Sequence, residues 1–355
     1  QAAYLPIVSG KVGDADAQAF GTLTDSLPKP ILAYCRSGTR SSTLWSLSEG
    51  GRGRPLPEII AATKTAGYDM AGVVRRIANG GRTPSEAVDA THTVVIIGGG
   101  AAGISVAASL KARKPDLDIA IIDPADIHYY QPGWTMVGGG IFDAKSTART
   151  MGSLIPFGVR WIKAAVAAFE PENSAVVLDG CRVVKYRHLV VAPGLKLNWD
   201  GIEGLTETLG RNGVTSNYRY DLAPYTWELV QGLKTGRAVF TQPPMPIKCA
   251  GAPQKALYLS ADHWYRTGRL ANIQIDFFNA GAVLFGVKEY VPALMSYIDK
   301  YQAQLHFQHR LTRVDGAAKT AYFTQTNADG TTQTVETGFD MIHVVPPQVA
   351  PDFVR

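Results

Sequence analysis

Residues 94–103, VVIIGGGAAG, decide the fold of most of this chain of 355 residues. The first four residues are apolar and predict a buried strand of a parallel sheet. Gly98, Gly100 and Gly103 then form the pattern G-x-G-x-x-G at the start of an apolar helix. In a βαβ unit these glycines allow a tight turn and let the backbone approach the pyrophosphate of a dinucleotide.

The next predicted strand completes this unit. Residues 119–122 are apolar throughout, and Asp123 follows them, 20 residues after Gly103. A carboxylate at this point accepts hydrogen bonds from the ribose of the dinucleotide. A glycine-rich turn without a ligand is the alternative, but the strand, helix and acidic residue together favour a dinucleotide site. A further apolar strand is followed by Gly194. A glycine at the end of such a strand is typical of a second contact with FAD, so it favours FAD over NAD.

A second α/β unit begins at Arg237 and includes RAVFTQPPMPIKCAGAPQK over residues 237–255. A flavoprotein that also binds a nicotinamide cofactor repeats its glycine turn here. Pro243, Pro244 and Pro246 instead remove three backbone N–H donors, so that turn cannot form. We therefore expect a flavoprotein half that has lost its nicotinamide site and has a thiol in its place.

Cys249 is the candidate redox residue of this stretch. Lys248 precedes it, Lys255 lies six residues further on, and residues 253–264 predict a helix. Cations and a helix N-terminus stabilise a thiolate. A buried structural cysteine is the alternative, because free cysteines are among the most buried residues. The missing glycine turn favours the functional interpretation.

A second candidate thiol lies near the start of the chain. Residues 31–34 predict a short buried strand, and a helix is expected from Ser41. Between them Cys35 and Arg40 bound a loop whose N–H groups, arginines and following helix dipole stabilise a thiolate. The loop is one residue shorter than that of a tyrosine phosphatase, which favours persulfide transfer over attack on phosphate. A cysteine that lies incidentally in a strand-to-helix turn is the alternative.

The remaining patterns complete the expected α/β fold. Cys181 follows a predicted tight turn at residues 179–180 and is interpreted as structural or incidental. Helices are expected at 56–66, 70–79 and 287–304, a hairpin at 176–184, and strands at 189–194, 273–278, 306–314, 319–326 and 331–337.

Composition excludes other classes of protein. Hydrophobic residues make up 46% and charged residues 18%, as in globular proteins, and no run of about 18 apolar residues predicts a membrane-spanning helix. The net charge is +5, but no basic cluster is interleaved with aromatic residues, so no nucleic acid is expected. Three distant cysteines and seven histidines without ligand spacing predict neither a disulfide framework nor a metal site.

Three motifs resemble the sulfide:quinone oxidoreductases: residues 95–104 (VIIGGGAAGI), 122–138 (IDPADIHYYQPGWTMVG) and 247–259 (IKCAGAPQKALYL). The family has two tandem Rossmann-like halves, binds FAD, oxidises sulfide to a cysteine-bound persulfide and passes two electrons to a quinone. The resemblance implies that Cys249 receives sulfane sulfur or meets the flavin, and we expect Lys255 to stabilise its thiolate or the reduced flavin. The residues expected to contact FAD are Gly98, Gly100, Ala101, Ala102, Gly103, Asp123, Gln131, Val166 and Gly194.

The start of the chain, around YCRSGTR at residues 34–40, resembles the rhodanese-like or phosphatase-like module found beside sulfide-oxidising enzymes. Sulfurtransferase and phosphatase activity both stay open for it. We therefore predict a small α/β module at residues 1–79, a linker at 80–91 and an FAD-dependent oxidoreductase at 92–355. The oxidoreductase is divided into a first FAD-binding half at 92–210 and a second Rossmann-like half at 211–345.

Some family features are not found in this chain. Both ends look truncated, and the family's second redox cysteine, its late Gly-Asp motif and its C-terminal amphipathic helices are missing. The resemblance implies sulfide, a quinone and an acceptor thiol for sulfane sulfur as partners. It also implies a cytoplasmic protein held peripherally on the inner membrane through those helices.

Two other functions remain open. A nicotinamide-dependent flavoprotein, such as a type II NADH dehydrogenase or a disulfide reductase, needs a glycine turn near residue 242, and a disulfide reductase also needs a close cysteine pair. A non-catalytic sulfur-carrier module would use Cys35 as its reactive group.

Overall fold

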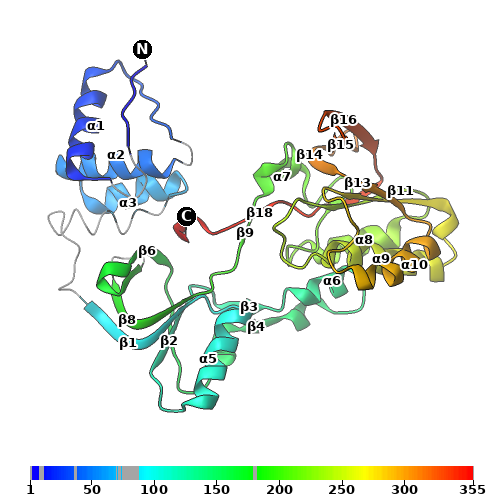
Figure 1. Cartoon of the computed structure of the whole chain (residues 1–355), viewed down its shortest axis with the longest axis horizontal. Coiled ribbons are helices and arrows are strands. Elements are labelled where there is room, and N and C mark those ends of the chain that lie inside the picture. Colours follow the sequence, from blue (N-terminus) through cyan, green and yellow to red (C-terminus); the bar gives the residue numbers. More distant parts are fainter. Residues whose placement is uncertain are drawn as a thin grey trace. The chain divides into compact units, whose positions relative to one another are not determined.

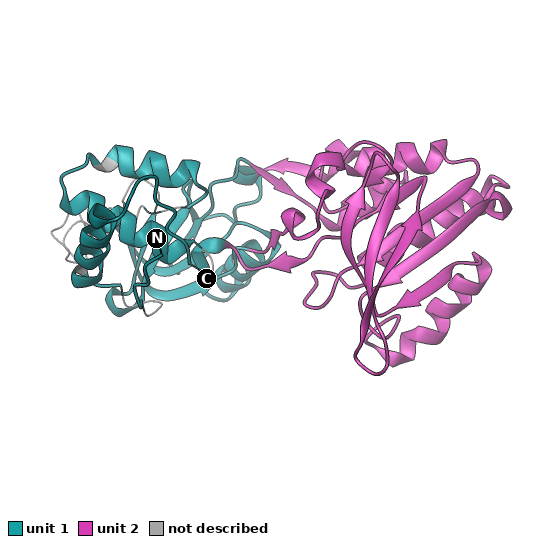
Figure 2. Ribbon diagram, turned by 90° about the horizontal axis from the view of Figure 1, so that it is seen from above, with its two compact units in different colours: residues 1–126, 151–193, 352–355 teal, residues 127–150, 194–351 magenta. Residues whose placement is uncertain are grey.

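The computed structural model describes residues 2–7, 12–35, 38–68, 70, 73, 88–178 and 182–354. Two compact units make up the chain, and Figure 2 shows them in different colours. Unit 1 consists of residues 1–126, 151–193 and 352–355, and unit 2 of residues 127–150 and 194–351. The domain boundaries expected from the sequence remain a prediction.

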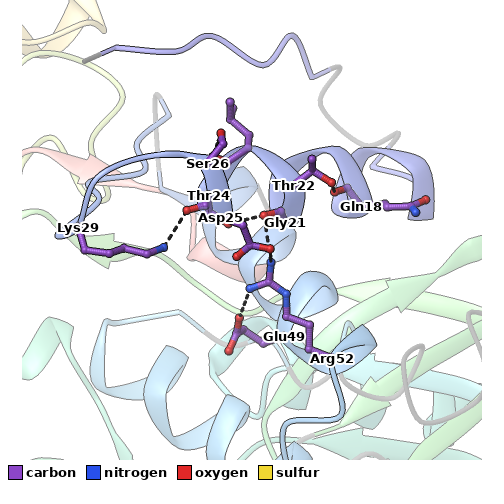
Figure 3. A network of polar contacts seen from close by, with 10 residues as sticks. Gln18, Gly21, Thr22, Thr24, Asp25, Ser26, Lys29, Glu49 and Arg52 are labelled. Carbon is purple, nitrogen blue, oxygen red and sulfur yellow. Dashed lines mark hydrogen bonds and ion pairs between the residues drawn. The ribbon is translucent and has the colours of Figure 1, made fainter.

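The first part of unit 1 is helical, with α1 (Asp14–Ser26), α2 (Thr39–Gly51) and α3 (Leu56–Thr65). Arg52 connects α1 to the end of α2, as Figure 3 shows. Its guanidinium donates to the carbonyl of Gly21 at 3.0 Å, to Asp25 at 2.6 Å and to Glu49 at 3.2 Å. The predicted helices at 41 onward and at 56–66 are confirmed, whereas the helix at 70–79 lies mostly outside the described residues.

The buried strand predicted at residues 31–34 is wrong. The segment forms no strand, and the side chains of Leu32 and Tyr34 are 85% and 86% exposed. An apolar run becomes a strand only where a neighbouring strand pairs with it, and no described strand pairs with this segment.

A six-stranded sheet forms the rest of unit 1. Its order is β5 (Arg160–Ile162), β2 (Ile119–Ile122), β1 (Val88–Ile97), β8 (Val183–Val191), β7 (Ala175–Leu178) and β6 (Val166–Glu170). Strand β1 pairs in parallel with β2 and β8, and α5 (Ala101–Arg113) packs beside β1 and β2, as the predicted βαβ unit requires.

Three expectations for this sheet need adjustment. Residues 88–91 of the predicted linker belong to β1, while 80–87 lie outside the described residues. The predicted hairpin is the antiparallel pair β7–β8, and its turn, with Cys181, also lies outside them. The separate buried strand predicted at 189–194 is wrong, because it is the end of β8, where Val191 is 46% exposed.

A five-stranded parallel sheet organises unit 2. Its order is β10 (Val214–Thr215), β17 (Met341–His343), β11 (Gly236–Gln242), β12 (Ile273–Asn279) and β13 (Gln304–Phe307). On one face Phe240 and Phe277 pack against α8 (Ala223–Gly232), α9 (Ala252–Arg266) and α10 (Val291–Lys300). On the other face Val239 and Phe278 pack against Phe323 of a three-stranded antiparallel sheet. Figure 1 shows the helices and this second sheet on opposite sides.

The three-stranded sheet consists of β14 (His309–Asp315), β15 (Thr320–Thr326) and β16 (Thr332–Gly338). The single strand predicted at 306–314 is therefore wrong, because Gln308 has φ of 60° and separates β13 from β14. The helix predicted at 287–304 is shorter, since α10 begins at Val291 and ends at Lys300. The short elements of unit 2 are β3 (Ile127–Tyr129), α6 (Pro132–Gly138), β4 (Ala148–Thr150), β9 (Lys196–Leu197), α7 (Leu205–Thr208) and β18 (Gln348–Val349).

Candidate flavin and thiol sites

The glycine turn between β1 and α5 has the geometry that the fingerprint requires. Gly98 has φ of +100°, and a Cβ there would lie 2.2 Å from the carbonyl oxygen of Ala192. A Cβ on Gly103 would lie 1.9 Å from the carbonyl oxygen of Gly98. A Cβ on Gly100 would meet nothing within 4 Å. Gly98 and Gly103 are needed for close packing of the protein. Gly100 leaves open space, in which a ligand can approach the protein backbone.

The start of α5 provides backbone donors beside this space. Gly100 is the N-cap residue and has no side-chain cap, and the first bond inside the helix runs from the Ile104 N–H to the Gly100 carbonyl at 3.1 Å. The N–H groups of Ala101, Ala102 and Gly103 precede that bond and have no helical partner. Together with the helix dipole they suit a pyrophosphate.

Asp123, after β2, fixes the turn as well as facing the expected ribose position. The Gly99 N–H donates to its Oδ2 at 2.7 Å, and the Ala125 N–H donates to its Oδ1 at 2.8 Å. A carboxylate offers about four lone-pair sites, so two acceptor positions remain for ribose hydroxyls. The role of Asp123 toward the ribose stays a prediction.

The other expected FAD contacts fall into both units. Val166 begins β6 in unit 1, and its side chain is buried in the core, so only its backbone could face a ligand. Gln131 and Gly194 belong to unit 2, where both are exposed. The structure thus brings the glycine turn, Asp123 and Val166 into one unit, and Gln131 and Gly194 into the unit that holds Cys249.

Unit 2 has a loop in place of a second glycine turn. Strand β11 ends at Gln242, and α9 begins only at Ala252, after the three prolines. The next strand ends at Asn279, whose amide donates to the Val283 carbonyl at 2.9 Å and accepts from the Gly281 N–H at 2.8 Å. A nucleotide-binding half has a helix directly after the turn and a carboxylate after the next strand. The described residues of unit 2 provide neither at these positions.

Cys249 lies in this loop, three residues before α9. It is exposed and has φ of 61°, a left-handed conformation that non-glycine residues rarely adopt. Its carbonyl accepts from the Ala252 N–H at 2.9 Å. The interpretation as a buried structural cysteine is therefore wrong.

Two lysines flank this thiol in the sequence, Lys248 directly before it and Lys255 six residues after it. Burial lowers the pKa of Lys248, the nearby Cys249 opposes that shift, and the positive charge of Lys255 adds to it. Lys255 is exposed in the first turn of α9, and its N–H donates to the Gly251 carbonyl at 3.0 Å. Nearby cations favour the thiolate form of a cysteine.

Two residues of this site have no sequence signal. The Tyr218 hydroxyl donates to the carbonyl of Lys248 at 3.1 Å, and the Lys248 N–H donates to Oε1 of Gln348. Both residues contact the backbone of the loop from distant parts of the chain. Because Tyr218 and Gln348 bind backbone atoms, which every residue has, their contacts do not require particular residue types in the loop. No sequence motif could therefore have revealed these two residues.

The structure describes only part of the predicted Cys35 loop. Gly38 has φ of 76°, and a Cβ there would lie 1.7 Å from the Tyr68 hydroxyl, so only glycine fits. Arg40 donates to the carbonyl of Ile7 at 2.9 Å. Cys35 is half-buried, and residues 36–37 lie outside the described part of the chain. The roles of Cys35 and Arg40 stay predictions.

The part of the chain that the structure describes contains no group of three or more His, Cys, Asp or Glu that could hold a metal ion. No helix among the described residues is long and apolar enough to cross a membrane.

Comparison with known proteins gives two family matches. Residues 92–226 match the pyridine nucleotide-disulphide oxidoreductase family. Residues 2–52 match the phosphatase-like domain of the beta-lactamase hydrolase-like proteins, which is one of the two modules expected there.

Individual relatives are more specific. The mitochondrial sulfide:quinone oxidoreductase of Dictyostelium discoideum is 43% identical over 72% of this chain, and that of Mus musculus 37% identical over 74%. The chain spans only 56% and 58% of these two relatives. The crystal structure of the sulfide:quinone oxidoreductase from Aquifex aeolicus has the same fold, with a TM-score of 0.63 and 20% identity over 74% of this chain and 60% of that one.

These matches confirm the α/β flavoprotein fold and FAD as its cofactor, and the residues of the glycine turn fit the pyrophosphate of FAD. The chain belongs to the sulfide:quinone oxidoreductase family.

Proposed function

We propose that this chain carries the FAD-binding and thiol-bearing parts of an enzyme that oxidises sulfide to a cysteine-bound persulfide and transfers the electrons to a quinone. One observation above all supports this proposal. An exposed cysteine, Cys249, follows Lys248 in the loop that stands where a nicotinamide-dependent flavoprotein has its second glycine turn, and Lys255 lies in the first turn of the next helix.

The thiol of Cys249 does the covalent chemistry in this proposal. Sulfide attacks a disulfide between Cys249 and the family's second redox cysteine. One S–S bond breaks, a new S–S bond joins the sulfide sulfur to that second cysteine, and Cys249 leaves as a thiolate. Lys248 and Lys255 stabilise the negative charge at this moment.

The remaining steps restore the disulfide. An acceptor thiol removes the sulfane sulfur from the second cysteine. Reforming the disulfide with Cys249 then releases two electrons, and FAD, when bound at the glycine turn, would supply the redox chemistry that delivers them to a quinone. Over one cycle sulfide loses two electrons, and the quinone gains two electrons and two protons.

The first part of the chain is proposed to be a separate module that handles the same chemistry. We infer that residues 1–79 form one domain and 92–355 another, with Cys35 and Arg40 as the reactive pair of the first. The similarity of residues 2–52 to a phosphatase-like domain supports an anion-binding loop there. A peripheral position on a membrane is likewise proposed for the whole protein.

The test uses the full-length protein, mixed anaerobically first with sulfide and then with NADH, while the flavin absorbance is followed. We expect sulfide to bleach the flavin and a short-chain quinone to restore its colour. Cys249→Ser should abolish bleaching by sulfide. Cys181→Ser is the matched control and should leave bleaching unchanged.

Two results would contradict the proposal. Normal reduction by sulfide in Cys249→Ser would remove the proposed role of this thiol. Bleaching by NADH alone would mean that the proline-rich loop binds a nicotinamide after all. Protein that purifies without colour and cannot be reconstituted with FAD would instead favour the sulfur-carrier function.

A further inference from the structure

The backbone of Cys249 has an unfavourable conformation that its surroundings must maintain. Its φ of 61° is a left-handed value that costs free energy for any residue with a Cβ. Such a conformation persists only where neighbouring groups hold it. Hydrogen bonds to the peptides on either side of Cys249 are the contacts that can do this.

The peptides around Cys249 are held at three points. On the N-terminal side, the Tyr218 hydroxyl donates to the Lys248 carbonyl at 3.1 Å, and the Lys248 N–H donates to Oε1 of Gln348. On the C-terminal side, the Ala252 N–H donates to the Cys249 carbonyl at 2.9 Å. The Tyr218 hydroxyl is also 3.5 Å from that carbonyl. We call Tyr218 and Gln348 the loop clamp.

The loop clamp rests on rigid elements of unit 2. Tyr218 follows β10, and its N–H donates to the Ser216 hydroxyl at 3.1 Å. The preceding N–H, of Asn217, donates to Nε2 of His343 at 2.9 Å. His343 ends β17, which pairs with β10, and Gln348 follows in β18. Tyr218 therefore lies just beyond the carboxyl end of β10, and Gln348 lies in β18, which pairs antiparallel with β9.

The Tyr218 hydroxyl keeps its proton under all ordinary conditions. Burial, and after it the negative charge of Cys249, raise the pKa of Tyr218 well above its usual value, and the nearby Gln348 amide opposes this only in part. Tyr218 is therefore a permanent donor to the loop.

We propose that Tyr218 and Gln348 are positioning residues that hold the backbone of Lys248, Tyr218 at its carbonyl and Gln348 at its N–H, and thereby direct the Cys249 thiol. Without them the loop would relax to a negative φ at Cys249, and the thiol would change its position relative to Lys248. The use of this thiol in sulfide oxidation rests on the proposed function above, whereas the clamp itself requires neither flavin nor quinone.

The test measures how fast iodoacetamide alkylates Cys249 as the pH is raised through the titration of the thiol. Cys35→Ser and Cys181→Ser leave Cys249 as the single thiol of the chain. In this background Tyr218→Phe removes one hydroxyl and should slow alkylation near neutral pH about three- to tenfold.

Tyr258→Phe is the matched control. Tyr258 is also half-buried in unit 2, and its hydroxyl donates to Gln254 at 3.2 Å and to the Leu294 carbonyl at 3.5 Å, away from the loop. Its removal should leave the pH profile of alkylation unchanged. Equal profiles for Tyr218→Phe and Tyr258→Phe, whether both change or neither does, would overturn the proposal.

Gln348 provides a second test that does not depend on Tyr218. Gln348→Met removes the acceptor of the Lys248 N–H and should also slow alkylation, whereas Gln348→Glu retains an acceptor and should restore most of the rate. If Gln348→Met and Gln348→Glu behave alike, the clamp has no part in directing the thiol.

The proposed function can fail separately. Slower alkylation in Tyr218→Phe together with normal sulfide-dependent bleaching in Cys249→Ser would keep the clamp and refute the role of the thiol. Unchanged alkylation in Tyr218→Phe together with no sulfide-dependent bleaching in Cys249→Ser would refute the clamp and keep the role of the thiol.

Discussion

Replacing the glycines of the first turn one at a time separates packing from ligand binding. In Gly98→Ala the new methyl group would lie 2.2 Å from the Ala192 carbonyl oxygen at a φ of +100°. Left-handed strain of about 1–3 kcal/mol and overpacking of about 1–3 kcal/mol predict a total loss of roughly 2–6 kcal/mol in the free energy of unfolding.

Gly100→Ala should behave in the opposite way. Its φ is −73°, and the new methyl group meets no protein atom within 4 Å, so stability should stay within about 0.5 kcal/mol of the wild type or rise slightly. The same methyl group would occupy the space that a pyrophosphate needs. We expect affinity for FAD to fall at least about tenfold, or roughly 1.4 kcal/mol.

Two measurements on the chain decide between these effects: denaturant unfolding without ligand, and titration with FAD followed by quenching of flavin fluorescence. Stability lost to a similar degree in Gly100→Ala and Gly98→Ala would refute the packing argument. Unchanged FAD affinity in a stable Gly100→Ala variant would show that the dinucleotide does not approach the central glycine.

Three further predictions concern stability. Arg52→Ala should lower the free energy of unfolding of the first helices by about 1 kcal/mol, measured by thermal denaturation, because the Gly21 carbonyl, the exposed Asp25 and Glu49 lose this donor, although Glu49 retains Arg54. Burial lowers the pKa of His343 from 6.5 to about 4, so the unfolded chain binds the extra proton first. Stability should therefore fall by up to about 3 kcal/mol as the pH drops from 6.5 to 4, and His343→Gln should flatten this part of the profile. Burial acts to raise the pKa of Asp276, but hydrogen bonds from His306 and Arg237 outweigh it and lower the pKa. Asp276→Asn should cost about 3 kcal/mol in denaturant unfolding, and a cost near zero would mean that the three groups do not form a coupled buried network.

The first βαβ unit could be predicted because every signal for it is local. Strand β1, the three glycines, α5 and Asp123 lie within one short stretch. The wrong predictions have a different origin. Residues 31–34 are apolar enough for a strand but have no described partner, and pairing is a property of the whole fold.

The break between β13 and β14 shows a second limit of the sequence. The chain turns from one sheet to the other at Gln308, whose φ is 60°. A glycine at this position would have marked the turn. Glutamine gives no such signal, so the alternating pattern on both sides is interpreted as one strand.

The thiol site shows the same limit where it matters for function. Among the described residues, the other non-glycine residues with positive φ are polar and lie in turns: Ser174, Asn212, Gln302, Gln308 and Lys319. Cys249 differs, because it lies in the long loop between β11 and α9 and carries the candidate reactive group. Its strain is about 1–3 kcal/mol, and each hydrogen bond contributes about 0.5–1.5 kcal/mol. The bond from Tyr218 and the bond to Gln348 together contribute about 1–3 kcal/mol, which is comparable with the strain, so the loss of either one should loosen the loop even though the bond from the Ala252 N–H to the Cys249 carbonyl remains.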